Sequence, residues 1–150
     1  KAGYNNVLIA RAREDAESLG YLNIPFGMEC IEAIHMTALQ VANLPQEVSR
    51  IVMPVGSAMS FMGVLWGLEL FERDIEVLGV RVGADPTKRL EKYAPPGWES
   101  FASIEQSSYA YKDYFPDTHL SSGLEIDPIY EAKCLPYLEP DDLFWVVGIR

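Results

Sequence analysis

The sequence predicts an α/β fold of three layers, with a mostly parallel central sheet between helices. Two apolar, β-rich runs at residues 50–55 and 75–82 enclose an apolar stretch at 61–71 that is long enough for a helix. A strand, a helix and a strand in this order form the right-handed crossover unit of parallel sheets. Hydrophobic residues make up 49% of the chain, which argues against disorder. We expect a single α/β domain over residues 1–150, which could be a fragment of a longer chain.

The segments on both sides of this unit give further elements. Helical periodicity over residues 5–19 and 29–41 predicts two helices before the first strand. After residue 86 the pattern is less regular, and we expect helical fragments at 87–93 and 103–114. Two elements are expected near the C-terminus. They are a helix at 129–137 and a third buried strand at 143–147.

Composition restricts the classes of partner. A net charge of −10 works against nonspecific binding to nucleic acid or to anionic membranes. We find no apolar run long enough to cross a bilayer and no signal peptide, so we expect a cytoplasmic protein.

Cys30 and Cys134 have apolar neighbours and form no metal motif, which predicts reduced core thiols. His35 is predicted to be a core or boundary histidine and His119 an exposed loop residue, with no metal site at either.

The turn after the first strand is the candidate ligand site. It consists of Gly56, Ser57, Ala58, Met59 and Ser60. Backbone N–H groups and the helix dipole at such a strand-to-helix turn favour an anion, and the two serines add hydroxyl groups. A plain connection with a serine cap fits the same residues. The turn is neither a Walker A loop nor the G-x-G-x-x-G fingerprint. A phosphoribosyl- or nucleotide-binding protein would also use this turn, but the chain lacks the acidic pair in a strand–loop that such transferases usually show, so this function ranks lowest.

Five segments together resemble a known family. Residues 56–64 are similar to the G-S-G-G-T-x-A-G-L phosphate loop of fold-type II (tryptophan synthase β-like) pyridoxal-phosphate enzymes, in the branch of aminocyclopropane-carboxylate deaminase and D-cysteine desulfhydrase. In the family's order, residues 24–27 resemble its I-P-x-G stretch and residues 77–82 its V-x-G-V-x-V strand. Residues 127–133 resemble its D-P-x-Y-x-G-K segment, and residues 146–148 its late glycine turn. The resemblance spans nearly the whole chain and implies the C-terminal part of such an enzyme.

The resemblance also implies roles for particular residues. The amides of the turn and the Ser60 hydroxyl would hold the phosphate of pyridoxal 5'-phosphate. Tyr130 would stand on the substrate side of the ring as the catalytic candidate. Glu131 would face the pyridine nitrogen, where a carboxylate strengthens the electron sink. Without the family match, Glu131 reads as an exposed acid at an ordinary helix start. The implied reaction is a lyase or deaminase step on a small amino acid.

The chain departs from the family pattern at several positions. Ala58 and Met59 replace the paired glycines of the loop, which indicates a degenerate phosphate loop whose side chains obstruct a phosphate. The family's Schiff-base lysine lies upstream of the I-P-x-G stretch, and neither Lys1 nor Lys133 is a credible substitute. We therefore expect an N-terminal companion segment or a partner chain, including a homo-oligomer, to supply the lysine. The alternative is a non-catalytic scaffold that has lost the cofactor or binds another small anion.

Overall fold

The computed structural model describes residues 4–148 and divides the chain into two compact units, residues 1–30 and 31–150. The expectation of a single domain over residues 1–150 stays a prediction. Within residues 4–148, no helix has the length and the apolar character needed to cross a membrane.

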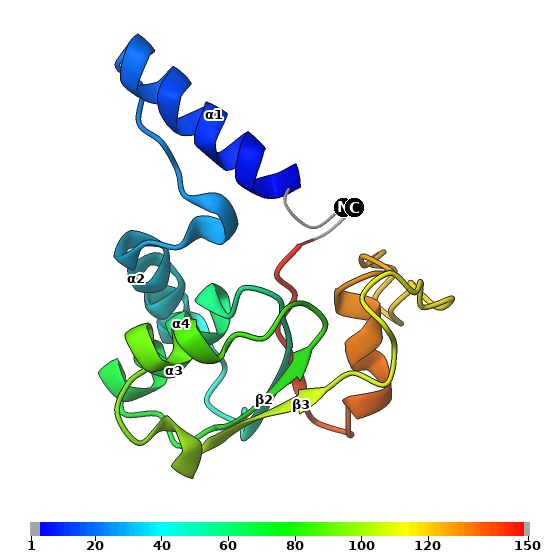
Figure 1. Cartoon of the computed structure of the whole chain (residues 1–150). Helices are drawn as coiled ribbons and strands as arrows, with labels where there is room; N and C mark the ends of the chain where they lie inside the picture. The colour runs from blue at the N-terminus through cyan, green and yellow to red at the C-terminus, as the bar shows by residue number, and fades with distance from the viewer. Residues whose placement is uncertain (1–3, 149–150) are drawn as a thin grey trace. The chain divides into compact units, whose positions relative to one another are not determined.

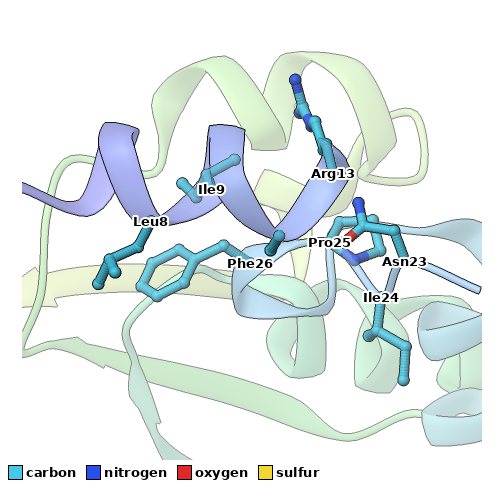
Figure 2. Close-up of a pocket in the computed structure, with 8 residues that line it drawn as sticks. Leu8, Ile9, Arg13, Asn23, Ile24, Pro25 and Phe26 are labelled. Atoms are coloured by element: carbon cyan, nitrogen blue, oxygen red, sulfur yellow. The ribbon is translucent and has the colours of Figure 1, made fainter. Parts of the chain in front are cut away.

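The first unit consists of a helix and a short irregular segment. Helix α1 covers Tyr4–Leu19 and ends at Gly20, whose φ of 69° is the left-handed conformation typical of a glycine after a helix. A single 3-10 turn, η1, follows at Phe26–Met28. The helix and the following segment enclose a hollow of about 220 Å³, shown in Figure 2. The residues that line it are Leu8, Ile9, Ala12, Arg13, Asn23, Ile24, Pro25 and Phe26.

The second unit is built on a four-stranded parallel sheet. Its strands are β1 (Arg50–Val55), β2 (Glu76–Arg81), β3 (Ala102–Gln106) and β4 (Leu143–Phe144), in the order β3-β2-β1-β4. All three strand pairs are parallel, and β1 and β2 are in register over six residue pairs. Both strands are almost entirely buried, because the layers on both faces cover them. The predicted α/β fold with a parallel sheet is confirmed.

Helices cover both faces of this sheet (Figure 1). Helix α3 (Met59–Leu70) follows β1, α4 (Thr87–Tyr93) follows β2, and the 3-10 turn η3 (Trp98–Ser100) precedes β3. Their side chains share one core with Ile51, Met53 and Val55 of β1. Side chains of the 3-10 helix η4 (Glu131–Tyr137) pack with Val52, whose side chain points to the opposite face. The result is three layers, with the sheet in the middle.

Helix α3 also packs closely against helix α2 (Ile31–Gln40), which the 3-10 turn η2 (Val41–Asn43) extends. The contact is made through Gly63 and Gly67 of α3. A Cβ atom at Gly63 would lie 2.5 Å from the Cβ of Thr37. A Cβ atom at Gly67 would lie 2.4 Å from Cγ2 of Val41 and 2.6 Å from the carbonyl oxygen of Ala38. The two glycines therefore allow the helix backbones to approach each other directly.

Three expected elements differ in the structure. The expected helical fragment at 103–114 is wrong, because its first residues form β3, an edge strand whose outer face is exposed. The helix expected at 129–137 is a 3-10 helix that begins at Glu131 and contains Pro136. The strand expected at 143–147 pairs only at Leu143 and Phe144, and both are half-buried. Short pairing on an outer strand leaves little sequence signal.

The two cysteines occupy different environments. Both are free thiols. Cys134 is fully buried on the sheet face covered by η4, as expected. Burial raises the pKa of the Cys134 thiol, so the thiol stays protonated. Cys30 is only half-buried, so the expectation of a core thiol is wrong there.

Candidate functional site

The order in which the chain adds strands to the sheet reverses between β1 and β4. From β1 the chain proceeds outward through β2 to β3, and then returns to form β4 on the other side of β1. Loops at the carboxyl ends of β1 and β4 therefore diverge, and in parallel sheets ligands bind in the crevice at this switch point. Gly56 follows the last residue of β1, and Gly148 lies four residues after the last residue of β4. The topology thus places the candidate turn at the expected binding edge of the sheet.

The turn leads directly into helix α3, which begins two residues earlier than expected. Ala58 precedes the first helical residue and adopts the left-handed conformation, with φ 65°. The first intrahelical bond runs from the Met62 amide to the Ala58 carbonyl, at 2.9 Å. The amides of Met59, Ser60 and Phe61 precede this bond, so the helix itself provides them with no acceptor. The Met59 amide lies 3.5 Å from Oγ of Ser57, a long contact. The helix start therefore presents the donors that a phosphate needs.

Ala58 and Met59, the two central residues of the turn, point into the protein. Ala58 and Met59 are each 3% exposed and belong to the core between the sheet and α3. Gly56, Ser57 and Ser60 are half-buried, so these three form the accessible part of the turn. Ala58 is a non-glycine residue in the left-handed conformation. A glycine at that position would adopt this conformation without strain.

Tyr130 lies directly against the turn. A Cβ atom on Gly56 would lie 2.9 Å from Cε1 of Tyr130, so only a glycine leaves room for this ring. The ring packs edge-to-face on Tyr111, with centroids 6.2 Å apart. Asp127 accepts hydrogen bonds from the amides of Ile129 and Tyr130, at 2.7 and 2.9 Å, and so fixes the backbone that presents the ring. Burial, assisted by the Tyr111 side chain, raises the pKa of Tyr130 to about 12. The phenol therefore keeps its proton at neutral pH.

Glu131 is buried beside the late glycine turn. It is 3% exposed, and its Oε1 accepts a hydrogen bond of 2.9 Å from the Gly148 amide. Burial raises the pKa of this carboxyl group, while the Gly148 amide opposes the shift. The reading of Glu131 as an exposed acid is therefore wrong. Through Glu131 the structure joins η4 to the segment after β4, which is the other side of the switch point.

The remaining candidates lie elsewhere or have structural partners. His35 is exposed on α2, so its expected place in the core or at its boundary is wrong, and His119 is exposed as expected. Among the described residues, no three His, Cys, Asp or Glu side chains could hold a metal ion. Lys133 is fully buried, and its ammonium group donates to the carbonyl oxygens of Ala110 and Tyr111. The roles expected for the turn residues, Tyr130 and Glu131 stay predictions, but the structure brings them to one edge of the sheet.

Sequence reasoning missed two residues that belong to this constellation. Tyr111 lies in the irregular stretch after residue 86, yet its ring packs on that of Tyr130. Gly83 follows β2, and a Cβ atom there would lie 3.0 Å from the Cα of Gly56, so it completes the close packing around the turn. The only sequence signal for Gly83 was its position after a buried strand, the same position that Gly56 occupies after β1.

Comparison with solved structures gives a match to the crystal structure of an ACC deaminase homologue, with a TM-score of 0.70 and 20% sequence identity. The match covers 94% of this chain and 55% of the other, so the chain spans about half the length of that protein. At this identity the likeness shows the fold. No family model and no curated protein sequence matches the chain. The fold is therefore the one that the phosphate-loop resemblance implies.

Proposed function

We propose that residues 56–60 bind the phosphate of pyridoxal 5'-phosphate, and that the chain is the cofactor-binding part of a pyridoxal-phosphate enzyme. The observation that supports this most directly is the meeting of Gly56 and Tyr130 at the switch point of the sheet. The likeness to an ACC deaminase homologue agrees with it. The donor set fits an anion, because helix amides and two hydroxyl groups surround the accessible part of the turn.

The residues of this chain would then have separate tasks. The amides of the turn and the Ser60 hydroxyl bind the phosphate. Tyr130, which keeps its proton at neutral pH, offers a hydrogen-bond donor beside the turn. Glu131 is held by Gly148 and provides a buried carboxyl group for the pyridine nitrogen. When bound, pyridoxal phosphate supplies an electron sink for bonds at the amino-acid carbon.

The proposed reaction is a deamination or elimination on a small amino acid. It needs a lysine to bond the cofactor, and Lys133 is unsuitable because its ammonium group is buried against two carbonyl groups. A preceding segment, a second copy or another chain would supply the lysine. The second candidate function is a scaffold that binds a small anion without catalysis. The left-handed Ala58 favours this candidate, because it is a strained replacement at the centre of the turn.

Thermal unfolding with three ligands separates these functions. The ligands are pyridoxine 5'-phosphate, which lacks the aldehyde and cannot react with surface lysines, its unphosphorylated form, and inorganic phosphate. A ligand at one hundred times its dissociation constant stabilises the native protein by about 2.7 kcal/mol. For a domain of this size, that raises the melting temperature by about 5 to 10 °C. We expect this shift with the phosphorylated vitamer and little shift with the unphosphorylated form.

Two serine variants locate the binding. Ser60→Ala removes one hydroxyl donor from the phosphate, and we expect about tenfold weaker binding. Ser103→Ala removes an exposed serine from the middle of β3 and serves as the matched control, with unchanged binding. Equal shifts with inorganic phosphate and the phosphorylated vitamer would favour the anion-binding scaffold. The absence of any shift at millimolar ligand would refute both functions.

A further inference from the structure

Lys133 is a buried charged residue that the proposed chemistry does not use. It has no exposed surface, although a lysine side chain is seldom buried without partners. Its Nζ donates to the carbonyl oxygen of Ala110 at 2.8 Å and to that of Tyr111 at 3.0 Å. Both acceptors lie 22 to 23 residues earlier in the chain. The lysine therefore ties η4 to the backbone of a distant loop.

This loop reaches the candidate site through Tyr111. The Tyr111 ring packs edge-to-face on the ring of Tyr130, which fills the space over Gly56. Tyr111 itself is 61% exposed, so burial of its own ring does not hold it in place. The ring contacts Tyr130, and the backbone carbonyl of Tyr111 accepts a hydrogen bond from Lys133.

Other contacts also fix the same loop. The hydroxyl of Tyr137 accepts from the Ser108 amide at 3.2 Å and donates to the Gln106 carbonyl at 3.3 Å, near the start of the loop. Asp113 closes a turn in which its carboxylate accepts from the Ala110 amide and its own amide donates to the Ala110 carbonyl. Lys133 adds two hydrogen bonds from η4 to the backbone of this turn.

We propose that Lys133 is a positioning residue for the candidate site, whose buried ammonium group holds the backbone of residues 110 and 111 so that Tyr111 supports Tyr130 over Gly56. The inference rests on the proposed function for its consequence, which is tighter binding of the phosphorylated cofactor. The support itself is a property of the folded chain without ligand. The two can therefore be tested separately.

The test compares Lys133→Met with Lys112→Met in the full chain. Methionine has a similar length to lysine and no donor, and Lys112 is an exposed lysine of the same loop. Three quantities are measured. They are the hydrogen exchange of the Asp113 amide, the ring NMR shifts of Tyr130 at neutral pH, assigned with Tyr130→Phe, and the affinity for pyridoxine 5'-phosphate.

For Lys133→Met we expect at least about tenfold faster exchange at Asp113, because two charge-assisted hydrogen bonds to the loop are lost. We also expect altered Tyr130 ring shifts and about tenfold weaker binding, while Lys112→Met leaves all three unchanged. Tyr111→Ala, at an exposed position, should alter the Tyr130 shifts and the affinity without a change at Asp113. This variant keeps the test decisive if Lys133→Met does not fold.

Unchanged Tyr130 shifts in either Lys133→Met or Tyr111→Ala would overturn the inference. Exchange that rises equally at Asp113 and in the amides of β1 would also overturn it, because Lys133 would then act only on global stability. If the parent protein does not bind pyridoxine 5'-phosphate, the proposed function fails. Exchange and ring shifts would still decide whether Lys133 positions Tyr130.

Discussion

Gly67 lies at the point of closest approach between α3 and α2, where the structure leaves no space for a methyl group. A Cβ atom would lie 2.6 Å from the Ala38 carbonyl oxygen and 2.4 Å from Cγ2 of Val41. Carbon atoms in contact prefer about 3.5 to 4.0 Å, and a carbonyl group within a helix cannot rotate away, so the helices must separate by about 1 Å. Overpacking of this kind costs about 1–3 kcal/mol, or occasionally more.

The substitution Gly67→Ala also improves helix propensity, by about 1 kcal/mol. Because the contact involves helix backbone, we expect overpacking to prevail and the free energy of unfolding to fall by about 1–2 kcal/mol. Urea unfolding followed by circular dichroism measures the change, and an unchanged slope would show that the denatured state is unaffected. Glu69→Ala, at an exposed position of the same helix, should change stability by less than about 0.5 kcal/mol.

A Gly67→Ala protein as stable as its parent would refute the close packing of α2 on α3. It would also weaken the description of the candidate site, because the direction of α3 sets where its first amides point. Gly63→Ala offers an independent check, since the Cβ of Thr37 would lie 2.5 Å from the added atom. Both substitutions should act in the same direction.

Three further predictions concern the turn, the buried acid and an ion pair. Ala58→Gly should change the free energy of unfolding by less than about 1 kcal/mol, because relief of strain at φ 65° offsets the loss of a buried methyl group worth about 0.8 kcal/mol. Ala58→Val should lower it by about 2 kcal/mol in the same urea assay. The raised pKa of Glu131 means that the folded state binds the carboxyl proton more tightly than the unfolded state, so the stability that this proton contributes is lost as pH rises above 4.5 and through the folded pKa. Glu131→Gln should therefore match the parent in free energy of unfolding at low pH and exceed it at neutral pH. A difference in urea stability between the two proteins that stays constant across pH would contradict this. Asp142→Asn should cost about 2 kcal/mol, because Arg50 donates to this largely buried carboxylate at 2.7 Å, while Glu139→Gln, at an exposed partner 3.5 Å from Arg50, should cost less than about 1 kcal/mol.

The central strands could be predicted from the sequence because both of their faces are buried. A continuous apolar run as short as residues 50–55 fits few structures other than a buried strand, and the longer apolar run between β1 and β2 predicts the helix. Strand β3 has one covered face and a polar outer face with Ser103 and Glu105. Its alternation of apolar and polar residues is too short to distinguish a strand from a helical fragment. Strand β4 pairs only with β1, and no local pattern in the sequence indicates this pairing.

The candidate turn could be located from the sequence, but its surroundings could not. Glycine after a buried strand indicated Gly56, and the family motif indicated Tyr130. Their contact is long-range, because it joins the end of β1 to the residue that precedes η4, far later in the chain. The burial of Glu131 and Lys133 likewise depends on partners 17 to 23 residues away in the chain. Long-range partners of this kind leave no periodic signal.

The strand order β3-β2-β1-β4 has a consequence for how the protein is made. The centre of the sheet is formed by residues 50–81, while the β4 side is completed by residues about 90 positions after β1, as the pairing of Ile51 with Leu143 shows. Contacts of such high contact order form slowly, because a long loop must close first. During synthesis, β1, α3 and β2 can assemble while the ribosome is still reading the codons for η4 and β4. The turn at Gly56 is therefore incomplete and exposed until residues 130–148 have emerged, and a chaperone or a ligand present during translation would meet it in that state.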